Sequence, residues 1–144
     1  MVMHLQKLSV GSTSIDSLAK WQAQFVRRRQ KRGLSPYHEH VTRMFPKQKE
    51  ALLDGGSIYW VIKGQILCRN KIVALEEVRR QDGLKACSIL MEPELIAVSP
   101  VPRRAFQGWR YLKPEDAPGD LTHISGGTEL PSQLRQKLSD LGAW

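Results

Sequence analysis

The stretch Ser57–Val78, SIYWVIKGQILCRNKIVALEEV, constrains the fold more than any other part of this sequence. Apolar and aromatic residues alternate through its first half with a period of two, so that Trp60 faces one way and Tyr59 the other. Arg69–Lys71 then interrupts the apolar run, and one residue of this group, Asn70, tolerates a left-handed turn. We therefore expect a β-hairpin that turns at this polar segment.

Further strands are expected after this hairpin. Asp82-Gly83 lies between two strand-like runs, which is a strong hairpin signal. Leu84–Met91 then reads as the next strand, and Leu95–Val98 resumes the extended structure. Pro100 and Pro102 are expected to end it, because proline cannot donate a hydrogen bond to a sheet. Two earlier segments, Met1–Val10 and Tyr37–Phe45, also have strand patterns.

Three helices are predicted. The first carries apolar residues at helical spacing from Ile15 to Phe25, with a capping box at Thr13–Asp16 in which Ser14 is an alternative cap. A short second helix is expected after Pro46, and a third carries Leu134, Leu138 and Leu141 on one stripe. Consecutive antiparallel strands flanked by helices predict an α+β fold, a small, mostly antiparallel curled sheet or β-barrel flanked by three helices.

Size and cysteine content favour one reduced intracellular domain. A chain of 144 residues, taken as the single domain 1–144, can bury about two-thirds of its unfolded surface without disulfides. Its two cysteines, Cys68 and Cys87, lie in apolar segments, which indicates buried thiols. The first ten residues do not form a secretory signal, and no window approaches the roughly 18 apolar residues of a membrane span. We expect a cytoplasmic protein without membrane contact.

The net charge of +8 favours a polyanionic partner such as RNA. Part of this charge lies in Arg27–Arg32, just before Gly33. Cations at a helix C-terminus oppose the negative end of the dipole, so this cluster is explained either by the helix end or by phosphate binding.

Catalytic and metal-binding motifs are weak. His38 and His40 share one face of a strand, but no third ligand lies at a spacing that completes a metal site, so no metal and no cofactor are expected. The chain has no G-x-S-x-G motif and no phosphate loop, and Cys68 is expected to be buried and inert. No catalytic residue is assigned.

The segment Arg103–Tyr111 is the strongest candidate site, because arginines and aromatic rings surround Gly108 within it. Rings stack on bases and guanidinium groups bind phosphate, so this pattern suits single-stranded nucleic acid or an extruded base. The hairpin is expected to line the same groove, although the rings could instead pin a loop to the sheet. The predicted binding residues are Tyr59, Trp60, Lys63, Arg69, Arg103, Arg104, Gln107, Trp109 and Arg110.

Three blocks of the sequence resemble a family of alphaproteobacterial proteins, domain of unknown function 1489: HVTRM at 40–44, LDGGSIYWVIKG at 53–64 and FQGWRYLKPEDAP at 106–118. This resemblance implies no activity. More distantly, a helix, a glycine-bearing hairpin, further strands and a Pro-Val-Pro segment resemble the PUA-like barrels, including the ASCH and EVE groups. That likeness implies binding of RNA or a modified base, and some ASCH proteins are hydrolases. Of the ASCH signature G-x-K-x-x-E-x-R, however, only Gly64 and Arg69 are kept.

The preferred hypothesis is therefore a bacterial PUA-like protein that binds RNA or a modified base. One alternative is a small-molecule hydrolase of ASCH-like type that uses Lys63 with a carboxylate such as Glu76. The other is a protein–protein interaction module.

Overall fold

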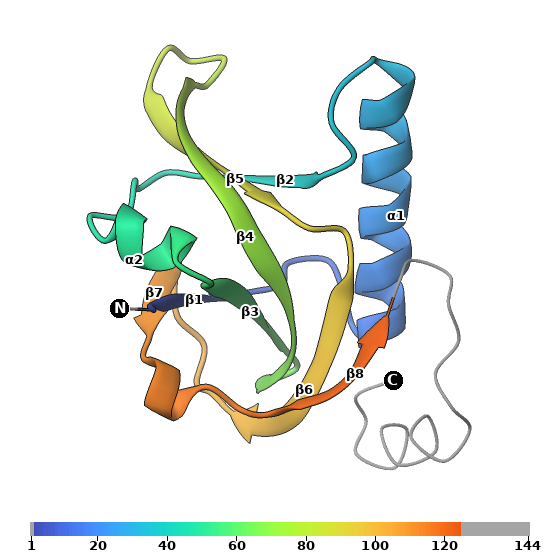
Figure 1. Ribbon diagram of the computed structural model, residues 1–144, viewed down its shortest axis with the longest axis vertical. Helices are drawn as coiled ribbons and strands as arrows, with labels where there is room; N and C mark the ends of the chain where they lie inside the picture. The colour runs from blue at the N-terminus through green and yellow to red at the C-terminus, as the bar shows by residue number, and fades with distance from the viewer. Residues whose placement is uncertain (1, 125–144) are drawn as a thin grey trace.

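The structure is a computed structural model that describes residues 2–124. The described part contains two helices, eight strands and one short 3-10 turn, Pro114–Asp116, arranged as drawn in Figure 1. The helices are α1 (Ile15–Lys31) and α2 (Lys49–Leu53). The strands are β1 (His4–Leu8), β2 (His38–Thr42), β3 (Ser57–Ile62), β4 (Gln65–Arg79), β5 (Lys85–Met91), β6 (Leu95–Pro102), β7 (Trp109–Leu112) and β8 (Asp120–Ile124).

The long strand β4 is the axis of the sheet. Its first half pairs with β3 on one edge and with β6 on the other, and its second half pairs with β5. β5 and β6 follow one another along the same edge of β4, as Figure 1 shows, and β8 extends the sheet beyond β6. From β5 to β7 the strand order is β5-β4-β3-β1-β7, with β2 outside β5. β1 runs parallel to β3, so the sheet is mixed.

The expectation of a closed barrel flanked by three helices is wrong. The sheet is open, because no backbone pairing joins β2 to β7 in the part that the structure describes. Side chains bridge these two ends instead: the indole N–H of Trp109 donates to the carbonyl of Met44 at 2.9 Å, and the Gln48 N–H donates to the Tyr111 hydroxyl at 3.1 Å. We call this unpaired boundary between β2 and β7 the seam. The third predicted helix, at Leu134–Leu141, lies outside the described residues.

The first hairpin turns at a different place from the one expected. The β3–β4 turn consists of Lys63 and Gly64, with φ angles of 52° and 79°, and β4 runs without a turn through 69–71. A left-handed pair matches the twist of a tight hairpin, and Gly64 adopts its angle without steric cost. The second hairpin does turn at Asp82-Gly83 as predicted.

Asn70 lies in the middle of β4 because its amide satisfies several buried groups. Its Oδ1 accepts from the Trp60 indole at 2.8 Å and from Gln22 at 3.0 Å, while its Nδ2 donates back to Gln22 at 3.0 Å. The same Nδ2 lies 3.0 Å and 3.3 Å from the carbonyls of Glu92 and Glu94, at the break between β5 and β6. A turn at this residue would leave these groups unpaired, so the tertiary hydrogen bonds outweigh the turn propensity.

The remaining differences concern the ends of elements. α1 is capped by Ser14, whose hydroxyl accepts from the Ser17 N–H at 3.1 Å, rather than by Thr13. β6 continues through Pro100 to Pro102, and the segment expected to be a binding loop contains β7.

One face of the sheet packs against α1 and contains most of the apolar core. Cys68 and Cys87 are both fully buried and free, as predicted. Burial raises the pKa of both thiols, that of Cys87 to about 11, so both stay protonated at neutral pH. Among residues 2–124, neither helix is long and apolar enough to cross a membrane.

Candidate functional site

Two hollows meet at the seam and form one groove, which we call the seam groove. The outer hollow encloses about 650 Å³ between the end of β2 and the start of β7. The inner hollow encloses about 240 Å³ between α1, β2 and the residues that follow β1. Lys7 and His40 line both hollows, so a ligand in one would contact the wall of the other.

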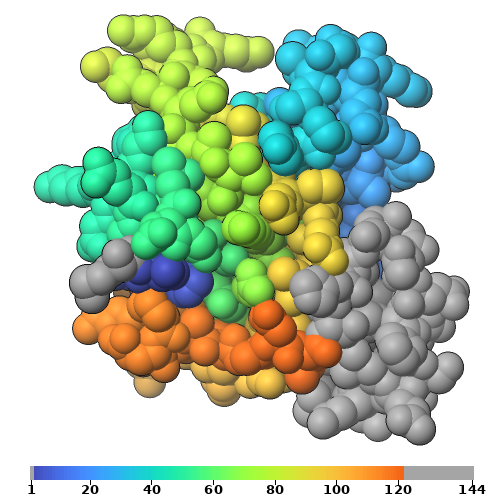
Figure 2. Space-filling view, viewed as in Figure 1, coloured from blue at the N-terminus to red at the C-terminus, as the bar shows by residue number. Residues whose placement is uncertain are grey.

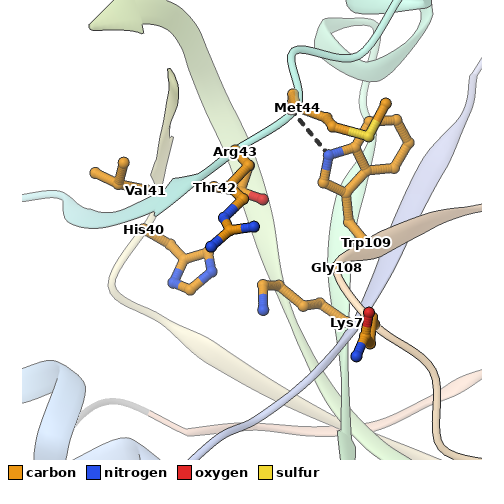
Figure 3. A pocket seen from close by; sticks show the side chains of 9 residues that line it. Lys7, His40, Val41, Thr42, Arg43, Met44, Gly108 and Trp109 are labelled. Atoms are coloured by element: carbon orange, nitrogen blue, oxygen red, sulfur yellow. Dashed lines mark hydrogen bonds between the residues drawn. The ribbon is translucent and has the colours of Figure 1, made fainter. Parts of the chain in front are cut away.

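Cations and one large ring border the outer hollow. Figure 3 shows His40 from β2, Arg43 just after β2 and Lys7 from β1 reaching toward the same space. Lys7 is the register partner of Trp109 on the neighbouring strand β7, and Met44 lies beside the Trp109 ring. The bond from the Trp109 indole to the Met44 carbonyl fixes this ring across the seam. The hollow therefore combines positive charge from both sides of the seam, Lys7 and Arg43, with an anchored aromatic surface.

The inner hollow is more aromatic. Trp60 forms part of its wall, and Asn70 fixes the orientation of that indole through the 2.8 Å hydrogen bond. Trp21 borders it from α1 and is 47% exposed, which is unusual for so large an apolar side chain. Leu8 and Leu18 add aliphatic surface. These residues suit a flat, uncharged group.

Aromatic packing holds the two histidines in place. The His40 ring meets Trp60 edge-on at 5.4 Å, and the His38 ring meets Trp21 at 5.2 Å and Phe25 at 4.8 Å, also edge-on. The expectation that both histidines share one face is consistent with this arrangement, since both line the inner hollow. Edge-to-face contacts of this kind orient a ring without using its nitrogen atoms.

Burial keeps both imidazoles neutral. It lowers the pKa of His38 to about 4, with smaller contributions from His40 and Arg29, and it lowers the pKa of His40 to about 4, with a smaller contribution from Lys7. Nδ1 of His38 and Nε2 of His40 are buried and have no hydrogen-bond partner among the described residues. Each buried polar atom without a hydrogen-bond partner lowers the stability of the folded state by about 1–3 kcal/mol. Unpaired atoms of this kind are often found at functional sites.

The groove is positively charged. Lys7 and Arg43 border it, and no aspartate or glutamate is among the described residues that line either hollow. Burial lowers the pKa of Lys7, because part of its side chain is removed from water. Glu39 lies between the two histidines in the sequence, but its carboxylate accepts from the Ser88 hydroxyl and lies 3.8 Å from Arg29.

Three of the nine residues predicted to bind line this groove, namely Trp60, Gln107 and Trp109. The alternation of side chains along β7 separates Arg110 from Trp109. Trp109 and Tyr111 pack toward the main core, whereas Arg110 lies on the opposite face and stacks over Phe106 at 5.2 Å. Lys63 and Arg104 are exposed and line neither hollow.

The opposite face of the sheet carries what we call the far-face cluster, which comprises Tyr59, Arg69, Arg103 and Arg110. Arg69 makes two bonds to the Asp120 carboxylate, at 2.9 and 2.7 Å, and a third to the Ser57 hydroxyl at 2.7 Å. Arg103 donates to Gln6 at 3.2 Å and to the Pro102 carbonyl at 2.8 Å. Both of these arginines are therefore bonded to the protein itself, and Tyr59 is buried, whereas Arg110 is exposed.

Sequence reasoning missed Lys7, Arg43 and Trp21, because each comes from a different element and none belongs to a motif. The one usable signal was the pair His38 and His40, which was considered only as a metal site. Within residues 2–124 no group of three or more metal-ligating side chains exists. The suggested hydrolase pair is also separated: Lys63 lies at the β3–β4 turn, and Glu76 lies eleven residues beyond the start of β4.

Comparison with known proteins identifies one family. Residues 5–144 match a family that is described as a protein of unknown function (DUF1489), which confirms the family of the first resemblance, while its alphaproteobacterial origin stays a prediction. No curated protein and no solved structure matches the chain. The more distant likeness to PUA-like domains stays a prediction.

Proposed function

Because the chain belongs to the DUF1489 family, whose description assigns no activity, we propose its function from the seam groove: it binds single-stranded RNA and accepts one base in the inner hollow. The observation that carries this proposal is a groove lined by cations and three tryptophans with no lining carboxylate among the described residues.

Charge supports an anionic ligand. Lys7 and Arg43 border the outer hollow, and the whole chain has a net charge of +8. A guanidinium binds phosphate through parallel N–H bonds, and a cationic groove raises the local concentration of a polyanion. The volume of about 650 Å³ lies within the usual range of ligand sites, which is about 300–1,000 Å³.

The rings support a single strand rather than a duplex. Trp109 and Trp21 offer surfaces on which unpaired bases stack, and such stacking contributes about 1–3 kcal/mol per base. Paired bases inside a helix cannot reach these rings. The inner hollow, at about 240 Å³, is too small for a drug-sized ligand and suits one ring system.

The neutral histidines support recognition of a base. An uncharged imidazole has one donor and one acceptor nitrogen, and His38 and His40 each have a ring nitrogen without a partner among the described residues. A base edge, modified or not, presents complementary donors and acceptors. We therefore assign the base to the inner hollow and the phosphates to Lys7 and Arg43.

The experiment is a binding titration of a ten-nucleotide single-stranded RNA, measured by fluorescence anisotropy at several salt concentrations. Arg43→Met keeps the aliphatic stem but removes the charge, and we expect the affinity to fall about tenfold. The slope of log affinity against log salt should also become shallower by about 0.7, which corresponds to one lost phosphate contact on a single strand.

Lys63→Met is the matched control, because it removes one charge from an exposed position that lines neither hollow. Its affinity should stay within about twofold of the unmodified protein, since it makes no phosphate contact. Equal effects of the two substitutions, or no binding by the unmodified protein, would remove the proposal.

A further inference from the structure

The helix α1 carries aromatic and basic side chains along one line. Trp21, Phe25, Arg28 and Arg32 are separated by four, three and four residues, which places them on one face of a helix that turns 100° per residue. Arg32 is the C-cap residue of α1. The Trp21 and Phe25 rings lie 5.7 Å apart with an angle of 33° between them. We call these four residues the α1 stripe.

The stripe begins at the seam groove. Trp21 forms part of the inner wall, and both Trp21 and Phe25 contact His38, which also lines that hollow. From Trp21 to Arg32 the helix rises by about 16 Å at 1.5 Å per residue. The stripe is therefore a continuous path from the inner hollow to the far end of α1.

The two arginines of the stripe are available for a ligand. Arg28 and Arg32 are exposed and form no ion pair with any described residue. Their neighbour Arg29 is different, because it bonds to the Ser35 hydroxyl at 3.0 Å and lies 3.8 Å from Glu39. Figure 2 shows the C-terminal end of α1 projecting from the body at the upper right, separated by a notch from the β4–β5 hairpin.

We propose that the α1 stripe guides the RNA strand out of the seam groove, with the rings of Trp21 and Phe25 beneath its bases and Arg28 and Arg32 on its phosphates. This inference rests on the proposed function and adds the direction and length of the bound strand. A path of about 16 Å corresponds to about five stacked nucleotides at 3.4 Å each. The complete site thus needs a base in the inner hollow plus about five nucleotides beside it.

Helix geometry supplies a matched control. Arg27 and Lys31 lie at the same end of α1, and they are also exposed and form no ion pair with the described residues. At 100° per residue they are turned by about 120° and 80° from Trp21, and therefore lie off the stripe. Two double variants, Arg28→Ala/Arg32→Ala and Arg27→Ala/Lys31→Ala, each remove two positive charges from the same helix end. Only the first removes the charges that belong to the α1 stripe.

The experiment compares both double variants on a three-nucleotide and a ten-nucleotide RNA over a range of salt concentrations. For the ten-nucleotide RNA, the stripe variant should bind about tenfold more weakly, and its salt slope should become shallower by about 1.4, equal to two phosphates. The control variant should change the affinity by less than about threefold. Neither variant should affect the three-nucleotide RNA, which is too short to reach Arg28 from the hollow.

If both double variants weakened RNA binding equally, the effect would be a general electrostatic one, and the proposed role of the α1 stripe would be refuted. The same conclusion would follow if neither variant weakened binding. A different result would refute RNA binding in the seam groove: Arg43→Met would leave the RNA affinity unchanged, while the stripe variant would still lower it. Thermal unfolding of every variant checks that the fold is intact, since exposed substitutions usually change stability by less than about 0.5 kcal/mol.

Discussion

The seam groove and the far-face cluster contain similar side chains but differ in how these are bonded. Arg69 and Arg103 in the far-face cluster donate to carboxylate, hydroxyl, amide and carbonyl oxygens of the protein. Arg43 and Lys7 in the seam groove form no ion pair with any residue in the described range 2–124. A cation that is already paired within the protein stabilises the fold, whereas an unpaired cation is free to bind a ligand.

The largest expected effect tests how the groove wall is supported. Asn70→Leu keeps a similar side-chain volume but leaves the Trp60 indole, the Gln22 amide and two backbone carbonyls without their hydrogen-bond partner. The free energy of unfolding should therefore fall by about 4 kcal/mol. Urea denaturation measures this change. Lys71→Leu, at the next and exposed position, should alter stability by less than about 0.5 kcal/mol. A loss below 1 kcal/mol in Asn70→Leu would contradict the role of this amide.

The next effect concerns pH and the groove histidines. The pKa values of His38 and His40 are about 4 in the folded protein, below the value of about 6.5 expected when unfolded. The unfolded chain therefore binds protons first as the pH falls, and stability is lost between about pH 6.5 and pH 4, on the order of 3 kcal/mol per histidine. Stability should be constant above pH 7 as far as these two residues are concerned.

Urea denaturation at pH 7 and pH 4.5 measures the acid sensitivity. His40→Phe retains an aromatic ring but cannot be protonated, so the difference in unfolding free energy between the two pH values should shrink by about half. An unchanged difference would show that His40 is not held neutral by burial. His4, whose ring packs against Tyr59 of the far-face cluster, also has a pKa lowered by burial, so a residual acid sensitivity should remain.

The smallest effect separates the two regions directly. Arg69→Met removes the bonds to Asp120 and Ser57, and the free energy of unfolding should fall by about 1–2 kcal/mol because that guanidinium is largely buried. RNA affinity should stay within about twofold. Arg43→Met should do the reverse, with weaker binding and unchanged stability. If both substitutions had the same pattern, the difference between the two regions would not hold.

The sequence predicted those features that depend on neighbouring residues. The alternation of Tyr59 and Trp60 on opposite faces, the Asp82-Gly83 turn and the burial of both cysteines each follow from a local pattern, and the structure confirms them. The place of Asn70 does not follow from such a pattern. Its partners lie 48 residues before it and more than 20 residues after it, and no local propensity reports those distances.

The candidate site was only partly predictable for the same reason. Segment 103–111 was interpreted as one binding loop, but Trp109 and Arg110 lie in β7 and therefore point to opposite faces. The groove itself gathers Lys7 from β1, Trp21 from α1 and the residues around Arg43 from the end of β2. Whether the ends of a sheet join or leave a gap depends on its total twist and curl, which no single segment encodes.

The open boundary between β2 and β7 has a consequence for how the binding cleft can be tuned. The two walls of the groove belong to β2 and β7, which lie at opposite edges of the sheet. The hydrogen-bonded strands that connect β2 to β7 therefore include the central strand β4. No residue of β4 lines either hollow, yet β4 lies on the only path of paired strands between the two walls of the groove in the described residues. Substitutions that straighten or tighten β4 should therefore rescale the ligand preference from a position that the ligand never touches.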